Sequence, residues 1–133
     1  MIVPVFAQEI WKMEKEVMEA VQQADVAKYH SFFSVDFIGW PTIYDSPVDY
    51  FGIIEWVKKI KNESYRLCYS LEFMNANRVS PNNVNIFYRL NIEYTNLAGE
   101  TWGGGQYLKV FHSWYFSDSW KIICGMSSRT TSA

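Results

Sequence analysis

The hydrophobic pattern of this 133-residue chain changes its period once, near Ser64. Before that point apolar side chains recur every three or four residues, which is typical of helices that bury one face. After it they alternate with polar side chains, most strictly over Val84–Tyr94, which is typical of strands with one buried face. Helices that precede a run of strands joined by short turns favour an α+β fold. We therefore expect a single domain over residues 1–133, with N-terminal helices and a curved antiparallel sheet.

Three helices are expected in the N-terminal half. The first covers Gln8–Gln23, where the apolar side chains follow helical spacing. The second, Ala24–Phe33, begins near Asp25, whose carboxylate suits an N-cap. The third is expected to begin at Ser46-Pro47-Val48-Asp49, because serine can cap a helix and proline suits its first turn, and to end near Asn62.

Five strands are expected. One short strand, Asp36–Trp40, lies between the second and third helices, and the others follow Ser64. These are Tyr65–Asn75, Val84–Tyr94, Thr101–Phe116 and Trp120–Met126. Three consecutive glycines, 103–105, predict a bend or bulge in the long fourth strand. Ser117-Asp118-Ser119 predicts a tight hairpin before the last strand.

Charge and composition exclude several classes of partner. The net charge of −2, without clustered Lys and Arg, predicts no nucleic-acid partner and no membrane partner. No apolar run reaches the length of a membrane span, and we expect no signal peptide. Cys68 and Cys124 lie on separate expected strands, so we expect buried free thiols and a cytoplasmic location. No residues have metal-site spacing, and no cofactor is expected.

Two segments resemble the nuclear transport factor 2-like superfamily. ADVAKYHSFFSVDFIGWP (Ala24–Pro41) is similar to a helix, an apolar pair, an acidic residue and a strand in these proteins, and FHSWYFSDSWKIICGMSS (Phe111–Ser128) is similar to their terminal hairpin. The order of elements looks closest to SnoaL-like proteins and to the association domain of calcium/calmodulin-dependent protein kinases. The resemblance implies a cone-shaped, cystatin-like roll, in which the sheet curls around a pocket that three N-terminal helices close. It also implies a homodimer formed through the outer sheet faces.

The composition also favours a pocket. The chain has 6 Trp, 9 Tyr and 9 Phe but few Leu, and such rings with polar tips suit the wall of a ligand site. We expect a hydrophobic, aromatic-lined pocket for a small apolar molecule, and the candidate lining residues are Trp40, Tyr44, Trp56, Tyr88, Tyr94, Trp102, His112 and Trp114. Among these His112 can orient a ligand through a hydrogen bond, or equally be a core histidine.

Arg89 is a further ligand-binding candidate, for a carboxylate. Its position is similar to that of a pocket arginine in the kinase association domains, and a guanidinium can hold a carboxylate through two hydrogen bonds. Strand alternation instead places Arg89 opposite the apolar set, where Glu72 or Glu93 would pair with it. Both placements remain open at this stage.

Three functions are compatible with these features. The first is a small-molecule-binding domain whose ligand the sequence does not specify. The second is a cofactor-free SnoaL-like enzyme of isomerase, cyclase or dehydratase type, acting on a small apolar substrate. Ketosteroid isomerase chemistry is not expected, because Trp40 occupies the position where the resemblance places the base. The third is a dimerisation or assembly module.

Overall fold

The computed structural model describes residues 2–130, and of residues 102–105 only the backbone. The helices are Val5–Gln22 (α1), Val26–Ser31 (α2), the short 3-10 helix Gly52–Ile54 (η1) and Glu55–Asn62 (α3). The strands are Phe33–Trp40 (β1), Val48–Asp49 (β2), Arg66–Ser80 (β3), Asn83–Thr95 (β4), Thr101–Phe116 (β5) and Trp120–Thr130 (β6). The predicted α+β class and the predicted order of helices and long strands are confirmed.

The six strands form one sheet in the order β2-β1-β6-β5-β4-β3. Neighbouring strands are antiparallel except β1 and β6, which run parallel with Trp40 opposite Met126. The sheet is therefore mixed, and it agrees with the expected, mostly antiparallel sheet except at this one parallel pair. The parallel pair arises because β1 lies between β2 and the C-terminal strand β6, and not beside the long strand β3 that follows α3.

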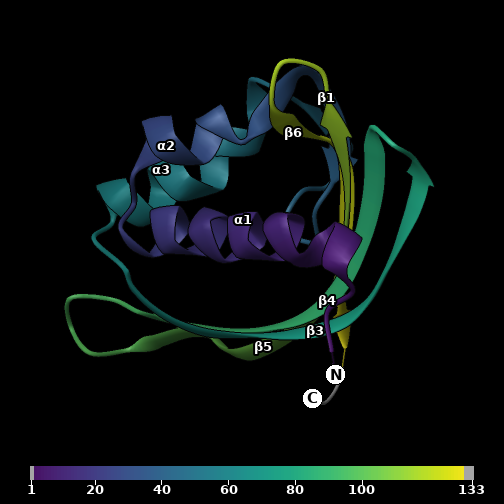
Figure 1. The fold of residues 1–133 in the computed structure, drawn as a ribbon. Helices are drawn as coiled ribbons and strands as arrows, with labels where there is room; N and C mark the ends of the chain where they lie inside the picture. Colours follow the sequence, from purple (N-terminus) through teal and green to yellow (C-terminus); the bar gives the residue numbers. More distant parts are fainter. Residues whose placement is uncertain (1, 131–133) are drawn as a thin grey trace.

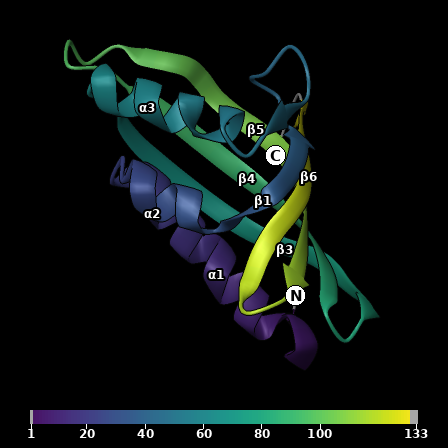
Figure 2. The same ribbon diagram turned by 90° about the horizontal axis from the view of Figure 1, so that it is seen from above.

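The sheet curls around α1, and all three helices lie on its concave side (Figure 1). Seen from above, α1 runs along nearly the same diagonal as β3 and β4 (Figure 2). Register shifts, which bend strands, occur after Phe73, between Ile92 and Tyr94, and between Ser113 and Trp114. The second of these lies opposite residues 102–106 of β5, so the bulge predicted at the glycines is confirmed.

The side chains of β4 alternate strictly between the two faces of the sheet, and the inward set forms the sheet side of the core. These inward side chains are at most 5% exposed, and they are Val84, Ile86, Tyr88, Leu90, Ile92 and Tyr94. They face the apolar side of α1, where Ile10, Val17 and Val21 are almost fully buried. Each such side chain contributes roughly 1.5–3 kcal/mol by leaving water, which holds the helix against the sheet.

The third helix begins later than predicted. Val48 and Asp49 form β2, which pairs with Gly39 and Ile38, so the residues expected to start a helix are extended. The Asp49 carboxylate then accepts hydrogen bonds from the backbone N–H groups of Phe51 and Gly52, and the chain enters α3 through η1. Pairing with β1 thus overrides the local helix-start signal. The predicted end at Asn62 and the predicted N-cap at Asp25 are confirmed.

Both cysteines are exposed, so the expectation of buried thiols is wrong. Cys68 and Cys124 project from the outer side of the sheet because strand alternation assigns the inner side to their neighbours. Within residues 2–130 no helix is long and apolar enough to cross a membrane. No group of three or more His, Cys, Asp or Glu residues gathers as metal ligands within the same range.

Candidate functional site

A cavity of about 90 Å³ lies between the concave face of the sheet and the helices. Its wall is mostly apolar, and α1, α2, α3 and strands β1, β4, β5 and β6 all contribute to it. The cavity reaches the surface beside Thr42, Ile43 and Met126, which are exposed. There the backbone N–H of Thr42 donates to the Ser127 hydroxyl at 2.9 Å, which ties the loop after β1 to β6 at the mouth.

A fully buried carboxylate, Glu14, lies behind one side of this cavity. It lies one helical turn after Ile10 and one turn before Met18 on the buried face of α1, and its exposure is 0%. A buried charge is unfavourable unless hydrogen bonds compensate it. The surroundings of Glu14 supply that compensation.

Three side chains donate hydrogen bonds to the Glu14 carboxylate. The Tyr88 hydroxyl donates to Oε1 at 2.9 Å, and the Trp114 indole Nε1–H donates to Oε2 at 2.8 Å. The His112 Nδ1 lies 2.7 Å from Oε2 and 2.9 Å from Oε1. The donors come from β4 and β5, so this network fastens the middle of α1 to the middle of the sheet.

Two members of the network, His112 and Tyr88, border the cavity, and His112 is the one that brings a ring nitrogen to it. The contact with Glu14 uses Nδ1, so Nε2 is left for another partner. The His112 side chain is 17% exposed and borders the cavity, and no described residue bonds to its Nε2. Gly125 makes room for the ring, because a Cβ there would lie 2.6 Å from His112 Cδ2.

Three buried tyrosines, hereafter the cavity tyrosines, also border the cavity, namely Tyr29, Tyr88 and Tyr94. Burial raises the pKa of each hydroxyl. The negative charge of Glu14 and the hydrogen bond to it raise the pKa of Tyr88 further. All three therefore keep their protons at neutral pH and can donate a hydrogen bond.

Of the predicted pocket residues, four border the cavity, namely Trp56, Tyr88, Tyr94 and His112. The side chain of Trp102 lies outside the described residues. The remaining four predicted residues, Trp40, Tyr44, Arg89 and Trp114, do not border the cavity. The structure thus brings together about half of the predicted set, and whether any of them binds a ligand stays a prediction.

Trp40 lies at the end of β1 and Tyr44 in the loop that follows, and neither residue borders the cavity. Trp40 is 44% exposed on the outer side of β1, and its indole N–H donates to the Tyr44 carbonyl at 2.9 Å. The Tyr44 hydroxyl lies 3.0 Å from the Gly52 carbonyl and also accepts the Trp56 backbone N–H at 3.3 Å. Tyr44 therefore organises the start of α3 and does not border the cavity.

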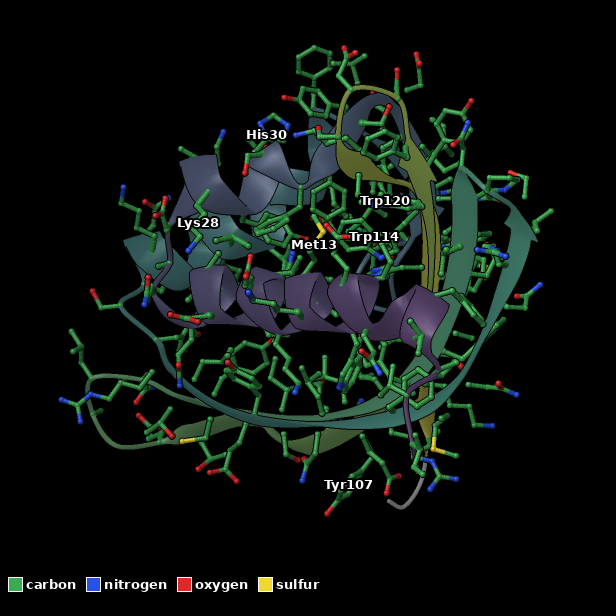
Figure 3. All side chains as sticks on the ribbon, in the orientation of Figure 1. Met13, Lys28, His30, Tyr107, Trp114 and Trp120 are labelled. Atoms are coloured by element: carbon green, nitrogen blue, oxygen red, sulfur yellow. The ribbon has the colours of Figure 1, made fainter. Side chains whose placement is uncertain are left out.

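Trp114 and Arg89 lie on opposite sides of the sheet. Trp114 is 0% exposed and lies in the interior between α1 and the sheet (Figure 3), where it holds Glu14 behind the cavity wall. Arg89 lies on the outer face and pairs with Glu72 at 3.4 Å, with both side chains more than half exposed. The pocket placement of Arg89 is wrong, and the alternation argument gives its position correctly.

Glu14 and Tyr29 are two polar residues at this site that were not among the predicted site residues. Glu14 occupies an apolar position of the α1 heptad, between Ile10 and Val17, and a carboxylate there is a recognisable signal for a buried charge. Tyr29 gave no comparable signal, because an aromatic residue on the apolar side of a short helix is expected in any core.

No protein-family model matches the sequence, and no curated protein matches it. Solved structures do match its fold. An NTF2-like protein of unknown function in nutrient uptake from Rhodospirillum rubrum is 14% identical, with a TM-score of 0.76 over 91% of this chain and 98% of that one. A type 2 hexachlorocyclohexane dehydrochlorinase is 10% identical, with a TM-score of 0.76 over 91% of this chain and 82% of that one.

A third structure, an uncharacterised protein with a cystatin-like fold from Caulobacter vibrioides, is 11% identical, with a TM-score of 0.70 over 92% of this chain and 87% of that one. At such identities the likeness concerns the fold alone. The neighbours include an enzyme and proteins of unknown function, so the fold leaves the activity open. The cone-shaped fold implied by the resemblance is confirmed.

Proposed function

We propose that this chain, which has the nuclear transport factor 2-like fold, binds a small and largely apolar molecule in the cavity between its sheet and its helices. The observation that carries the proposal is the Nε2 of His112, which has no partner among the described residues and belongs to a side chain on a mostly apolar cavity wall. Apolar sites with a few convergent polar groups are the usual form of small-molecule sites.

His112 would fix the orientation of the ligand. Its ring is held by Glu14 at 2.7 Å and confined by Gly125, so Nε2 has a defined direction before a ligand arrives. A ligand meeting such a prearranged atom loses little free energy in ordering the protein. We therefore expect the ligand to direct a hydroxyl, or another group that can hydrogen-bond, towards His112.

The proposal can be tested by filling the cavity. Thermal unfolding is measured with cyclohexanone, phenol and cyclohexanecarboxylate on the wild type and on Leu108→Phe. This substitution replaces an aliphatic side chain at the cavity wall by a larger aromatic one. A probe at one hundred times its Kd stabilises the wild type by about 2.7 kcal/mol, or roughly 8 °C for a domain of this size. Leu71→Phe is the matched control, since Leu71 is also half-buried but does not border the cavity.

Binding by the wild type and the control, but not by Leu108→Phe, supports the proposal. A probe that stabilises all three proteins equally is bound elsewhere on the surface. If no probe stabilises the wild type at any concentration up to its solubility, the proposed binding function is wrong.

A second candidate is a cofactor-free acid–base enzyme, and the close contact between Glu14 and His112 favours it. Nε2 would take a proton from a carbon next to a carbonyl group, leaving the electron pair on the resulting enolate. The carboxylate would stabilise the imidazolium that forms, and the proton would return to the same or another carbon. Isomerases, cyclases and dehydratases use steps of this kind.

Deuterium exchange separates this enzyme from a simple binder. The α-protons of cyclohexanone are followed by NMR in D₂O with the wild type and with His112→Phe. Exchange that is faster with the wild type, and falls to the uncatalysed rate with His112→Phe, supports general-base chemistry. Binding without faster exchange identifies the chain as a binding protein for this probe.

The assembly alternative rests on the outer face of the sheet. The strand registers place Trp40, Met126, Phe111 and Phe87 side by side in one row across β1, β6, β5 and β4. Trp40, Met126 and Phe87 are each more than 40% exposed, so the row offers an apolar surface that a second copy can cover. Figure 3 shows Tyr107 projecting from this same face.

We propose a homodimer through this row. Light scattering at tens of micromolar should give twice the mass of one chain, and Phe111→Lys should give the mass of one chain without unfolding it. A wild type that is monomeric at that concentration refutes the dimer but leaves the cavity proposal untouched.

A further inference from the structure

Tyr29 places a polar group at the cavity wall. It lies on α2, is 4% exposed and borders the cavity. Its ring packs against Phe33 and Trp56, with centroid separations of 5.0 and 5.9 Å, so the hydroxyl has little freedom to move. The position of this hydroxyl is therefore part of the fixed shape of the cavity.

The hydroxyl of Tyr29 has a hydrogen that no described residue accepts. The indole Nε1–H of Trp56 lies 2.8 Å from the Tyr29 oxygen, and an indole nitrogen can only donate. The Tyr29 oxygen is therefore the acceptor in this bond, and its own O–H remains to be donated. Buried donors in folded proteins nearly always find an acceptor, since an unpaired one is unfavourable.

The nearby polar groups do not supply this acceptor. The oxygens of Glu14 accept from Tyr88, His112 and Trp114 and make no bond with Tyr29. The Tyr29 hydroxyl also stays protonated at neutral pH, because burial raises its pKa and the negative charge of Glu14 adds to this effect. Tyr29 thus offers a permanent donor to whatever occupies the cavity.

We infer that the ligand of this cavity carries a carbonyl oxygen that accepts a hydrogen bond from Tyr29, and that Tyr29 and Trp56 together select carbonyl compounds over hydrocarbons of the same shape. The bond from Trp56 polarises the Tyr29 hydroxyl, which makes it a stronger donor. The inference rests on the proposed binding function and specifies its ligand class.

The same cavity favours an uncharged ligand of about one ring. No Lys or Arg side chain among the described residues borders it, and Arg89 pairs with Glu72 on the outer face. A carboxylate would therefore enter a wall without a countercharge, with the buried Glu14 behind it. An apolar cavity of about 150 Å³ holds benzene, so a cavity of about 90 Å³ takes no more than one ring, and its walls must move outwards to admit it.

The test compares two probes of one shape. Cyclohexanone and methylenecyclohexane differ in an oxygen against a CH₂ group, and their Kd values are measured on the wild type and Tyr29→Phe. We expect Tyr29→Phe to weaken cyclohexanone about threefold to tenfold, the usual effect of one hydrogen bond, and to leave methylenecyclohexane unchanged. Cyclohexanecarboxylate should bind neither protein.

Tyr29→Phe leaves the Trp56 indole without its acceptor, so a second variant serves as control. The double variant Tyr29→Phe/Trp56→Phe removes donor and acceptor together and should show the same selective loss of cyclohexanone. On the wild type alone, the infrared stretch of bound cyclohexanone should lie below its value in a hydrocarbon solvent.

Equal weakening of both probes by Tyr29→Phe, or an unshifted carbonyl stretch in the bound state, overturns the inference and leaves the binding function standing. Tight binding of cyclohexanecarboxylate also overturns it, since the ligand class would then be anionic. If neither ring compound binds the wild type, the binding function itself fails.

Discussion

Replacing Glu14 by alanine should lower the free energy of unfolding by about 2–6 kcal/mol. The substitution removes the acceptor of two fully buried donors, the Tyr88 hydroxyl and the Trp114 indole N–H. Each buried donor without a partner costs about 1–3 kcal/mol. His112 adds less, because it is 17% exposed and water can reach it. Release of the buried carboxylate from its unfavourable surroundings offsets part of the loss and keeps the expected value within this range.

Urea unfolding at pH 7 measures this loss directly. For a domain of this length a loss of 4 kcal/mol corresponds to a melting temperature about 12 °C lower. The matched control is Glu9→Ala on the same helix, since Glu9 is exposed and should change stability by no more than about 0.5 kcal/mol.

A double-mutant cycle tests whether the hydrogen bonds cause the loss. Tyr88→Phe removes one donor and nothing else, so Glu14→Ala should cost less in that background, by about 1–3 kcal/mol. A loss below about 1 kcal/mol for Glu14→Ala in the wild type, or purely additive effects of the two changes, would falsify the account of the network given above.

Three further outcomes are expected. Gly125→Ala should displace the His112 ring, lowering stability by about 1–3 kcal/mol and weakening probe binding, since its Cβ would lie 2.6 Å from Cδ2; unchanged binding of cyclohexanone would contradict this. Ile122→Ala should cost about 2–5 kcal/mol in urea unfolding, more than Trp120→Ala, because Ile122 is 0% exposed and Trp120 only half-buried; the reverse order would be inconsistent with the packing of β6. Stability should also fall above pH 10, by up to about 4 kcal/mol per pH unit, because the cavity tyrosines have raised pKa values and lose protons more readily in the unfolded chain. Below pH 10 the folded and unfolded states both keep these protons, so the cavity tyrosines add no pH dependence there. A free energy of unfolding in urea that stays constant from pH 9 to pH 11 would refute the raised pKa values of the cavity tyrosines.

The strands of this chain could be predicted because their signal is local. Alternation over Val84–Tyr94 specifies which side chains face inwards, and the structure buries that set. The third helix could not be placed equally well, because its start depends on a distant partner. Val48 and Asp49 pair with β1, and no local pattern reveals that pairing. Phe51, which follows this pair before the helix begins, is 73% exposed.

The candidate site was predictable only in part, for the same reason. Strand alternation correctly places Tyr88, Tyr94 and His112 on the inner face. Alternation does not distinguish the inner residues that border the cavity from those buried behind its wall. For this reason the predicted pocket set also contains Trp114, which is 0% exposed and does not border the cavity. The resemblance to kinase association domains suggested Arg89 for the pocket, yet the alternation of the strand decides its side.

The buried network is better explained by the cavity than by stability. A buried ionic group is often replaceable by apolar residues of similar volume at no loss of stability, so Glu14 is not required merely to fill the core. The Glu14 network joins four side chains from α1, β4 and β5. One of them, His112, brings a ring nitrogen to the cavity. At the same cavity Tyr29 offers an O–H that no described residue accepts. A cavity wall with a fixed imidazole nitrogen and a fixed phenolic donor is complementary to a small molecule with two polar points, and a solid core needs neither group.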